Sequence, residues 1–128
     1  MTRKTALLMT TASVLLAAAF GNSYLHAATE KPKGYLVAEI SVTDPEVYKQ
    51  YAAGVPPILA KYGGKYLVRG GQTEAVEGPT PAGRIVVIEF DSLAAAGTFE
   101  HSPEYQALAP LRHKAAQSRI FLVEGVNN

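Results

Sequence analysis

Two acidic side chains interrupt apolar segments that have the composition of β-strands. Glu39 lies within residues 35–42, and Glu89 lies within residues 84–90. A carboxylate in apolar surroundings either has a raised pKa or is held by a cation. Arg69, at the end of a shorter apolar run, is the expected partner. Such a Glu–Arg cluster would bind a small acid or transfer a proton, and the alternative is a structural ion pair.

Tyrosines and a second arginine lie on segments with helical spacing. For Tyr48, Tyr51, Tyr62 and Tyr105 the first expectation is core packing with the hydroxyl hydrated or hydrogen-bonded. Tyr48 and Tyr105 are also candidates for contact with a ligand. Arg112, near the end of the last helical segment, either reaches over a cleft or lies on a solvated helix face.

Histidine chemistry is limited to two positions in the main part of the chain, His101 and His113. His101 is a candidate acid or base because histidine titrates near neutral pH, and the alternative is a cation at a helix end. The spacing of the pair fits no compact metal motif. The chain has no cysteine, phosphate-binding glycine loop or G-x-S-x-G motif. We therefore expect neither a metal site nor a cofactor.

The N-terminus has the composition of a secretory signal. Arg3 and Lys4 precede an uncharged run rich in Ala and Leu, residues 6–20. This run is shorter than the ~20 residues that span a bilayer. We expect residues 1–28 to be a cleaved signal peptide, with an uncleaved anchor as the alternative. Residues 29–33 would then be a linker, residues 34–126 one domain, and the protein periplasmic or secreted.

Charge argues against two classes of partner. The whole chain has a formal charge of +1. Without the two basic residues of the expected signal peptide, 10 basic and 11 acidic residues remain, a net charge of −1. We therefore expect no nucleic-acid partner and, after cleavage, no membrane association.

The remaining pattern predicts a β-α-β-β-α-β order. Helix starts are indicated by Asp44-Pro45, Ser92 and Ser102-Pro103, and Pro56-Pro57 should bend or interrupt the first helix. Predicted strands cover residues 35–42, 65–69, 84–90 and 119–124, and predicted helices cover residues 45–62, 93–100 and 103–117. The order is that of an α+β, ferredoxin-like domain, with a four-stranded antiparallel sheet and helices on one face.

Such a sheet has one face that its own helices cannot cover. Residues 85 and 87 are apolar on one face of the third strand, and residues 86 and 88 are apolar on the other. Exposing an apolar face costs roughly 25 cal/mol per Å². We therefore expect a homodimer packed sheet to sheet, a dimeric α–β barrel. The alternative is that the loop 72–83 covers this face.

Four segments together resemble the domain of unknown function 1330 family: residues 44–51, 55–71, 84–90 and 102–112. The resemblance extends over about residues 34–125. It implies a ferredoxin-like fold of the dimeric α–β barrel superfamily. It implies no activity, because the family is named for lacking one.

Three functions remain open from the sequence. The first is binding of a small organic acid or aromatic molecule in a cleft between helices and sheet. The second is a cofactor-free enzyme, an isomerase or monooxygenase, with Glu89 or His101 as catalytic candidates, by analogy with related barrels. The third is a structural dimer without a ligand. The candidate ligand-binding residues are Glu39, Tyr48, Arg69, Glu89, Tyr105 and Arg112.

Overall fold

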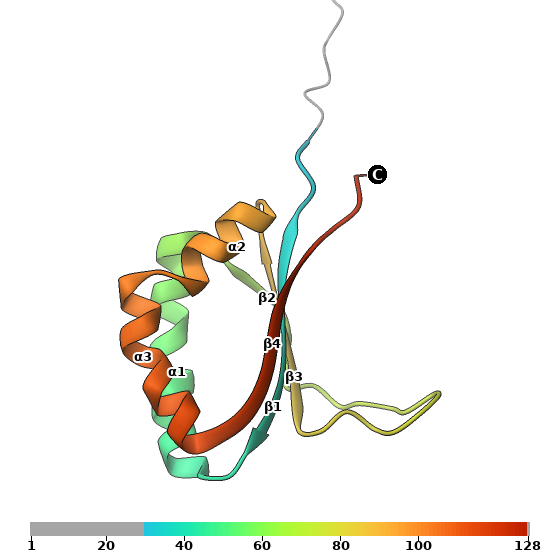
Figure 1. Ribbon diagram of the computed structural model, residues 1–128, viewed down its shortest axis with the longest axis vertical. Helices are drawn as coiled ribbons and strands as arrows, with labels where there is room; N and C mark the ends of the chain where they lie inside the picture. The colour runs from blue at the N-terminus through green and yellow to red at the C-terminus, as the bar shows by residue number, and fades with distance from the viewer. Residues whose placement is uncertain (1–29, 128) are drawn as a thin grey trace, which may run out of the picture.

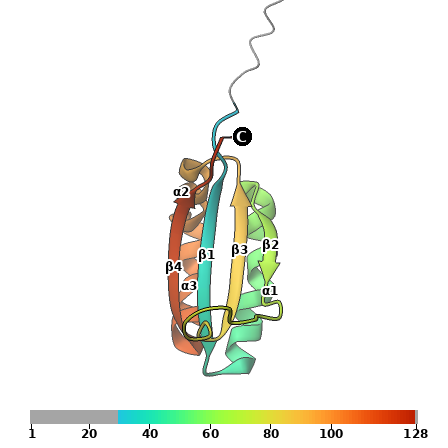
Figure 2. The ribbon, with the colours of Figure 1, turned by 90° about the vertical axis from the view of Figure 1, so that its right-hand side faces the viewer.

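Four strands form one antiparallel sheet in the computed structural model, which describes residues 30–127 (Figure 1). Their order across the sheet is β2-β3-β1-β4 (Figure 2). The strands are β1 Gly34–Val42, β2 Lys65–Arg69, β3 Arg84–Phe90 and β4 Ala116–Glu124. This confirms the predicted fold class, and β4 begins earlier than predicted.

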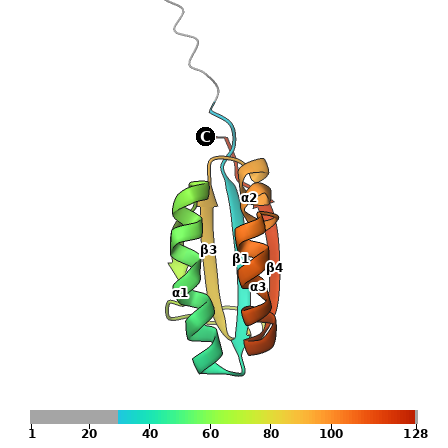
Figure 3. The same ribbon diagram turned by 90° about the vertical axis from the view of Figure 1, so that its left-hand side faces the viewer.

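Three helices pack on one face of the sheet, as predicted (Figures 1 and 3). They are α1 Pro45–Tyr62, α2 Leu93–Glu100 and α3 Pro103–Ala115. The side chains of Asp44, Ser92 and Ser102 accept hydrogen bonds from backbone N–H groups three residues later. These bonds satisfy N–H groups that lack partners within the first turn. The three predicted caps are therefore confirmed.

The first helix does not restart at the Pro56-Pro57 pair, one of the two predicted outcomes, because α1 continues through both prolines. Pro56 has no N–H, so the carbonyl of Ala52 four residues earlier lacks its helical partner. Arg69 Nη2 donates a hydrogen bond to that carbonyl oxygen at 3.4 Å. The helix thus tolerates this proline, and β2 supplies a side-chain donor for the freed carbonyl.

Alternation along the strands separates a buried face from an open face. The helix-facing positions of β1 and β3 are Leu36, Ala38, Ile40, Val86, Ile88 and Phe90, each at most 7% exposed. Glu39 and Glu89 both lie on the opposite face, as predicted, since β1 and β3 pair antiparallel. Large apolar side chains there, including Phe121 and Val123, are more than 40% exposed.

The segment 70–83 leaves the sheet on its open side (Figure 1). It forms neither helix nor strand, and it crosses in front of one end of the sheet (Figure 2). The N–H of Ala82 donates to Glu39 Oε1 at 2.9 Å, and Val76 is 92% exposed. The loop therefore covers one end of the open face and leaves the rest uncovered.

The expected signal peptide, residues 1–28, lies outside the described residues. Among residues 30–127, no helix is both long enough and apolar enough to cross a membrane.

Candidate ligand-binding site

A narrow cavity lies between α1 and the helix-facing side of the sheet. Its volume is about 30 Å³, room for roughly two water molecules. All four strands and all three helices contribute to its wall. The apolar lining consists of Leu36, Ala38, Ile40, Ala52, Val55, Val86, Ile88, Phe99 and Ile120. The polar lining consists of Tyr48, Tyr51, Tyr66, Arg69, Arg84 and Tyr105.

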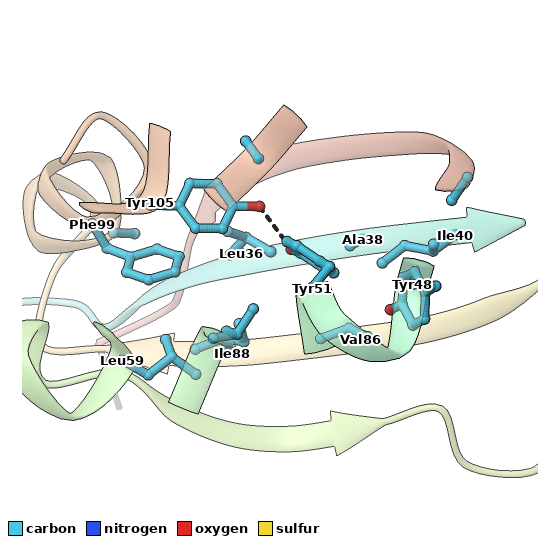
Figure 4. Close-up of a cluster of buried hydrophobic side chains, with 14 of the residues drawn as sticks. Leu36, Ala38, Ile40, Tyr48, Tyr51, Leu59, Val86, Ile88, Phe99 and Tyr105 are labelled. Carbon is cyan, nitrogen blue, oxygen red and sulfur yellow. Dashed lines mark hydrogen bonds between the residues drawn. The ribbon is translucent and has the colours of Figure 1, made fainter. Parts of the chain in front are cut away.

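Three buried tyrosines follow one another along this cavity (Figure 4). The ring centroids of Tyr48 and Tyr51 are 5.5 Å apart, and those of Tyr51 and Tyr105 are 6.4 Å apart. The hydroxyl oxygens of Tyr51 and Tyr105 are hydrogen-bonded at 2.9 Å. Burial raises the pKa of Tyr48 and of Tyr51, because a phenolate is poorly solvated there. Both groups are therefore neutral hydrogen-bond donors near pH 7.

A β-bulge directs Arg69 into the same cavity. The pairing of β2 with β3 shifts between Tyr66 and Val68. Tyr66 pairs with Ile88 and Arg69 pairs with Val86, two positions that face the helices. Regular alternation would place Tyr66 and Arg69 on opposite faces. The extra residue places both on the helix side.

Two contacts hold the Arg69 side chain at the cavity mouth. Its guanidinium carbon is 4.5 Å from the ring centroid of Tyr66, a cation–π contact. Its Nη2 donates to the carbonyl oxygen of Ala52, as described above. Burial raises the pKa of the Tyr66 hydroxyl, so this ring stays neutral beside the arginine.

Arg84 supplies a second guanidinium from β3. Its Cζ is 5.3 Å from the ring centroid of Tyr48. Gly70 makes room for it: its φ is +67°, and a Cβ there would come within 2.6 Å of Arg84 Nη2. The Nε of Arg84 is buried and has no hydrogen-bond partner within residues 30–127. A buried N–H without an acceptor is costly, which makes this group a donor available to a ligand or water.

The predicted pairing of Arg69 with Glu39 and Glu89 is wrong, because the sheet separates them. Glu39 Oε2 instead accepts from Arg119 Nη2 at 2.8 Å. The Ala82 N–H and this arginine lower the pKa of Glu39. Glu89 Oε2 accepts from the hydroxyl of Tyr35 at 3.3 Å. Both carboxylates therefore belong to the open face, and neither lines the cavity.

The remaining candidates lie around the inner end of the cavity or outside it. Arg112 is 7% exposed and lies beside Tyr105, so the expectation of a solvated helix face is wrong. Glu100 is half-buried near Arg112, and burial raises its pKa. His101 is exposed at the C-terminal cap of α2 and does not line the cavity. Among residues 30–127, no group of three or more metal-binding side chains occurs.

Three cavity residues were missed in the sequence: Tyr51, Tyr66 and Arg84. Arg84 lies two and four residues before the buried Val86 and Ile88, so strand alternation places all three on the same face of β3. This alternation could have identified Arg84 from the sequence. For Tyr51 the helical spacing predicts only core packing. Strand alternation could place Tyr66 on one face of β2, but its contact with Arg69 on the helix side depends on the bulge.

The family comparison agrees with the resemblance seen in the sequence. The family described as Domain of unknown function (DUF1330) matches residues 33–126. Comparison with curated proteins gives no match.

Solved structures share the fold at low sequence identity. A protein of unknown function from Rhodopseudomonas palustris, RPA0582, is 20% identical, with a TM-score of 0.59; the alignment covers 77% of this chain and 85% of that one. SnoaB, a cofactor-independent oxygenase from Streptomyces nogalater, is 14% identical, with a TM-score of 0.51, covering 76% of this chain and 96% of that one. At these identities the likeness shows the fold alone.

Proposed function

Because the chain belongs to the domain of unknown function 1330 family, whose name assigns no activity, we propose from the chemistry of the cavity that it binds a small organic acid. The carboxylate of this acid lies between Arg69 and Arg84 at the mouth. Its apolar or aromatic body extends inward along Tyr48 and the aliphatic wall.

One observation carries this proposal: two guanidinium groups face an apolar cavity without a carboxylate partner. Neither Arg69 nor Arg84 forms an ion pair with any of residues 30–127. A guanidinium presents a planar set of N–H donors that matches a carboxylate. Few convergent polar groups in an otherwise apolar wall are typical of small-molecule sites.

The cavity must widen to admit such a ligand, since it now has room for only roughly two water molecules. Arg69 and Tyr66 lie on β2, an edge strand of the sheet. The Arg69 side chain is exposed, and its hydrogen bond to Ala52 is long. These side chains can rotate outward without breaking a strand pair, and such side-chain movements are common on binding.

The experiment is calorimetric titration of the purified protein with benzoate and with benzamide, which has the same shape but no charge. We expect benzoate to bind at least about tenfold more tightly, the value of one charge-assisted hydrogen bond. Equal affinities would refute a site built for a carboxylate. Failure of benzoate, phenylacetate and short aliphatic acids to bind would refute the proposal as a whole.

An enzymatic role has less support. The catalytic candidates Glu89 and His101 lie away from the cavity, and the pKa of the buried Tyr51 is raised, which disfavours its use as a base. The likeness to a cofactor-independent oxygenase supports only the shared fold.

We also propose that two copies pair through their open sheet faces. The face is apolar across the sheet, with Val87 half-buried and Val68, Phe121 and Val123 more exposed. Its carboxylates already have partners in Arg119 and Tyr35. A symmetric sheet-to-sheet contact would bury these side chains and leave no carboxylate unpaired. Export of the processed chain is a further proposal, supported by the composition of residues 1–28.

A further inference from the structure

Building on the proposed acid-binding function, we infer that Tyr51 and Tyr105 form a second polar subsite at the inner end of the cavity. This subsite donates a hydrogen bond to an acceptor oxygen on the far end of the ligand. The ligand is then an elongated acid that carries a second oxygen, a hydroxyl or carbonyl, opposite its carboxylate.

Hydrogen-bond accounting for the two phenols gives the first argument. Tyr51 and Tyr105 are 7% and 2% exposed, and both line the cavity. Their oxygens are 2.9 Å apart, so one hydroxyl donates to the other. Each hydroxyl has one donor hydrogen. The accepting hydroxyl therefore keeps its own hydrogen. Within residues 30–127, neither hydroxyl has a further group to which it can donate.

The neighbouring side chain cannot use this hydrogen. Arg112 lies beside Tyr105 and is 7% exposed, but a guanidinium only donates. Its Nη2 contacts His113 Nε2 at 3.2 Å, and its Nε has no partner in the described part of the chain. Glu100 Oε2, near Arg112, is likewise buried without a partner among residues 30–127. The unused donor at the cavity itself is therefore the spare phenol hydrogen, and this hydrogen favours an electron-rich oxygen.

Aromatic side chains of the cavity wall separate its two polar ends, the arginine pair at the mouth and the phenol pair at the inner end. Arg84 lies over the ring of Tyr48. Tyr48 contacts Tyr51, whose hydroxyl is hydrogen-bonded to that of Tyr105 (Figure 4). A ligand anchored at Arg84 must therefore extend past the Tyr48 ring before it reaches the phenol pair. An aromatic acid with a para oxygen has this form, with polar atoms at both ends and an apolar middle.

The test uses pairs of acids that differ only at the far end. The first pair is 4-hydroxybenzoate and 4-methylbenzoate; the second is 4-hydroxyphenylacetate and 4-methylphenylacetate, one carbon longer. We expect the hydroxyl member of at least one pair to bind the purified protein about tenfold more tightly, because its oxygen supplies the missing acceptor.

Variants locate the preference. The double variant Tyr51→Phe/Tyr105→Phe keeps both rings, and removing both partners of a buried hydrogen bond is often nearly neutral for folding. The double variant should bind the methyl and hydroxyl members with equal affinity. The control is Tyr62→Phe, because the Tyr62 hydroxyl donates to Glu104 outside the cavity; this variant should keep the preference for the hydroxyl member. Single replacements are less informative, since the remaining hydroxyl still donates.

The outcomes separate the two proposals. If hydroxyl and methyl acids bind the wild-type protein equally, the phenol subsite is refuted while acid binding stands. If the double variant folds and retains the preference, the subsite is placed wrongly. If none of the four acids nor benzoate binds, the acid-binding function itself fails. The wild-type comparison decides the first point whether or not the double variant folds.

Discussion

The guanidinium carbon of Arg84 lies 5.3 Å from the ring centroid of Tyr48. Strand alternation directs Arg84 inward, and Gly70 leaves room for its guanidinium. The contact holds a cation at the cavity, and no carboxylate among residues 30–127 forms an ion pair with it. The proposed acid binding rests on that arrangement.

Arg84→Met should weaken benzoate binding by about 10- to 100-fold, the range for lost hydrogen bonds to a charged group. The unfolding free energy should stay the same or rise, because the substitution removes a half-buried charge that has no ion-pair partner in the described part of the chain. Calorimetry and urea unfolding measure the two effects. Lys49→Met, at an exposed position of α1, is the control. Unchanged benzoate affinity in Arg84→Met would exclude Arg84 from the site.

Val87→Glu should convert a dimer to a monomer, because it places an unpaired carboxylate on the open face. We expect the dimer dissociation constant to rise at least about 100-fold, measured by sedimentation equilibrium. The matched control is Ala107→Glu, on the exposed side of α3. A wild-type protein that sediments as a monomer at high concentration would contradict the pairing.

The ion pair between Lys61 and Glu104 should make folding stability depend on acid pH. Hydrogen bonds from Lys61 and then Tyr62 lower the pKa of Glu104 from 4.5 to about 2. Because the folded-state pKa is depressed, this contribution is complete above pH 4.5 and disappears as the pH falls towards 2.

Glu104→Gln should therefore be less stable than wild type near pH 7, and the difference should shrink between pH 4.5 and 2. Urea unfolding at a series of pH values measures it. Glu77→Gln, in the exposed loop, serves as the control. A difference that stays constant over this pH range would show that the effect of the substitution does not come from the carboxylate charge.

If the proposed export takes place, the mature protein should lack its N-terminal segment. Small residues allow cleavage after Gly21, Ser23, Ala27 or Ala28, so N-terminal sequencing of the secreted or periplasmic fraction should begin between residues 22 and 29. Replacing Leu15 and Leu16 with Arg should block export, because the apolar run is broken. Recovery of the intact chain with the cytoplasmic fraction would contradict export.

Alternation and capping residues were sufficient to predict most of the fold. Asp44, Ser92 and Ser102 marked the helix starts, and residues 84–90 marked a strand apolar on both faces. These signals depend only on residues close together in the sequence, so they could be recognised without the tertiary structure.

The site was predictable only in part, because its assembly depends on two tertiary details. The bulge between Tyr66 and Val68 reverses the face of Arg69, and a bulge depends on the pairing of two strands. The carbonyl freed by Pro56 then meets that arginine. Neither contact leaves a local pattern, so Arg69 was assigned to the carboxylates on the wrong face. The inward orientation of Arg84, by contrast, could be predicted from the alternation of residues along β3.

A crystal structure of the protein with bound benzoate tests the central claim most directly. We predict the carboxylate within about 3 Å of guanidinium nitrogens of both Arg69 and Arg84, with the ring against Tyr48. Benzoate found on the open sheet face, or an empty cavity in crystals grown at saturating benzoate, would contradict the account.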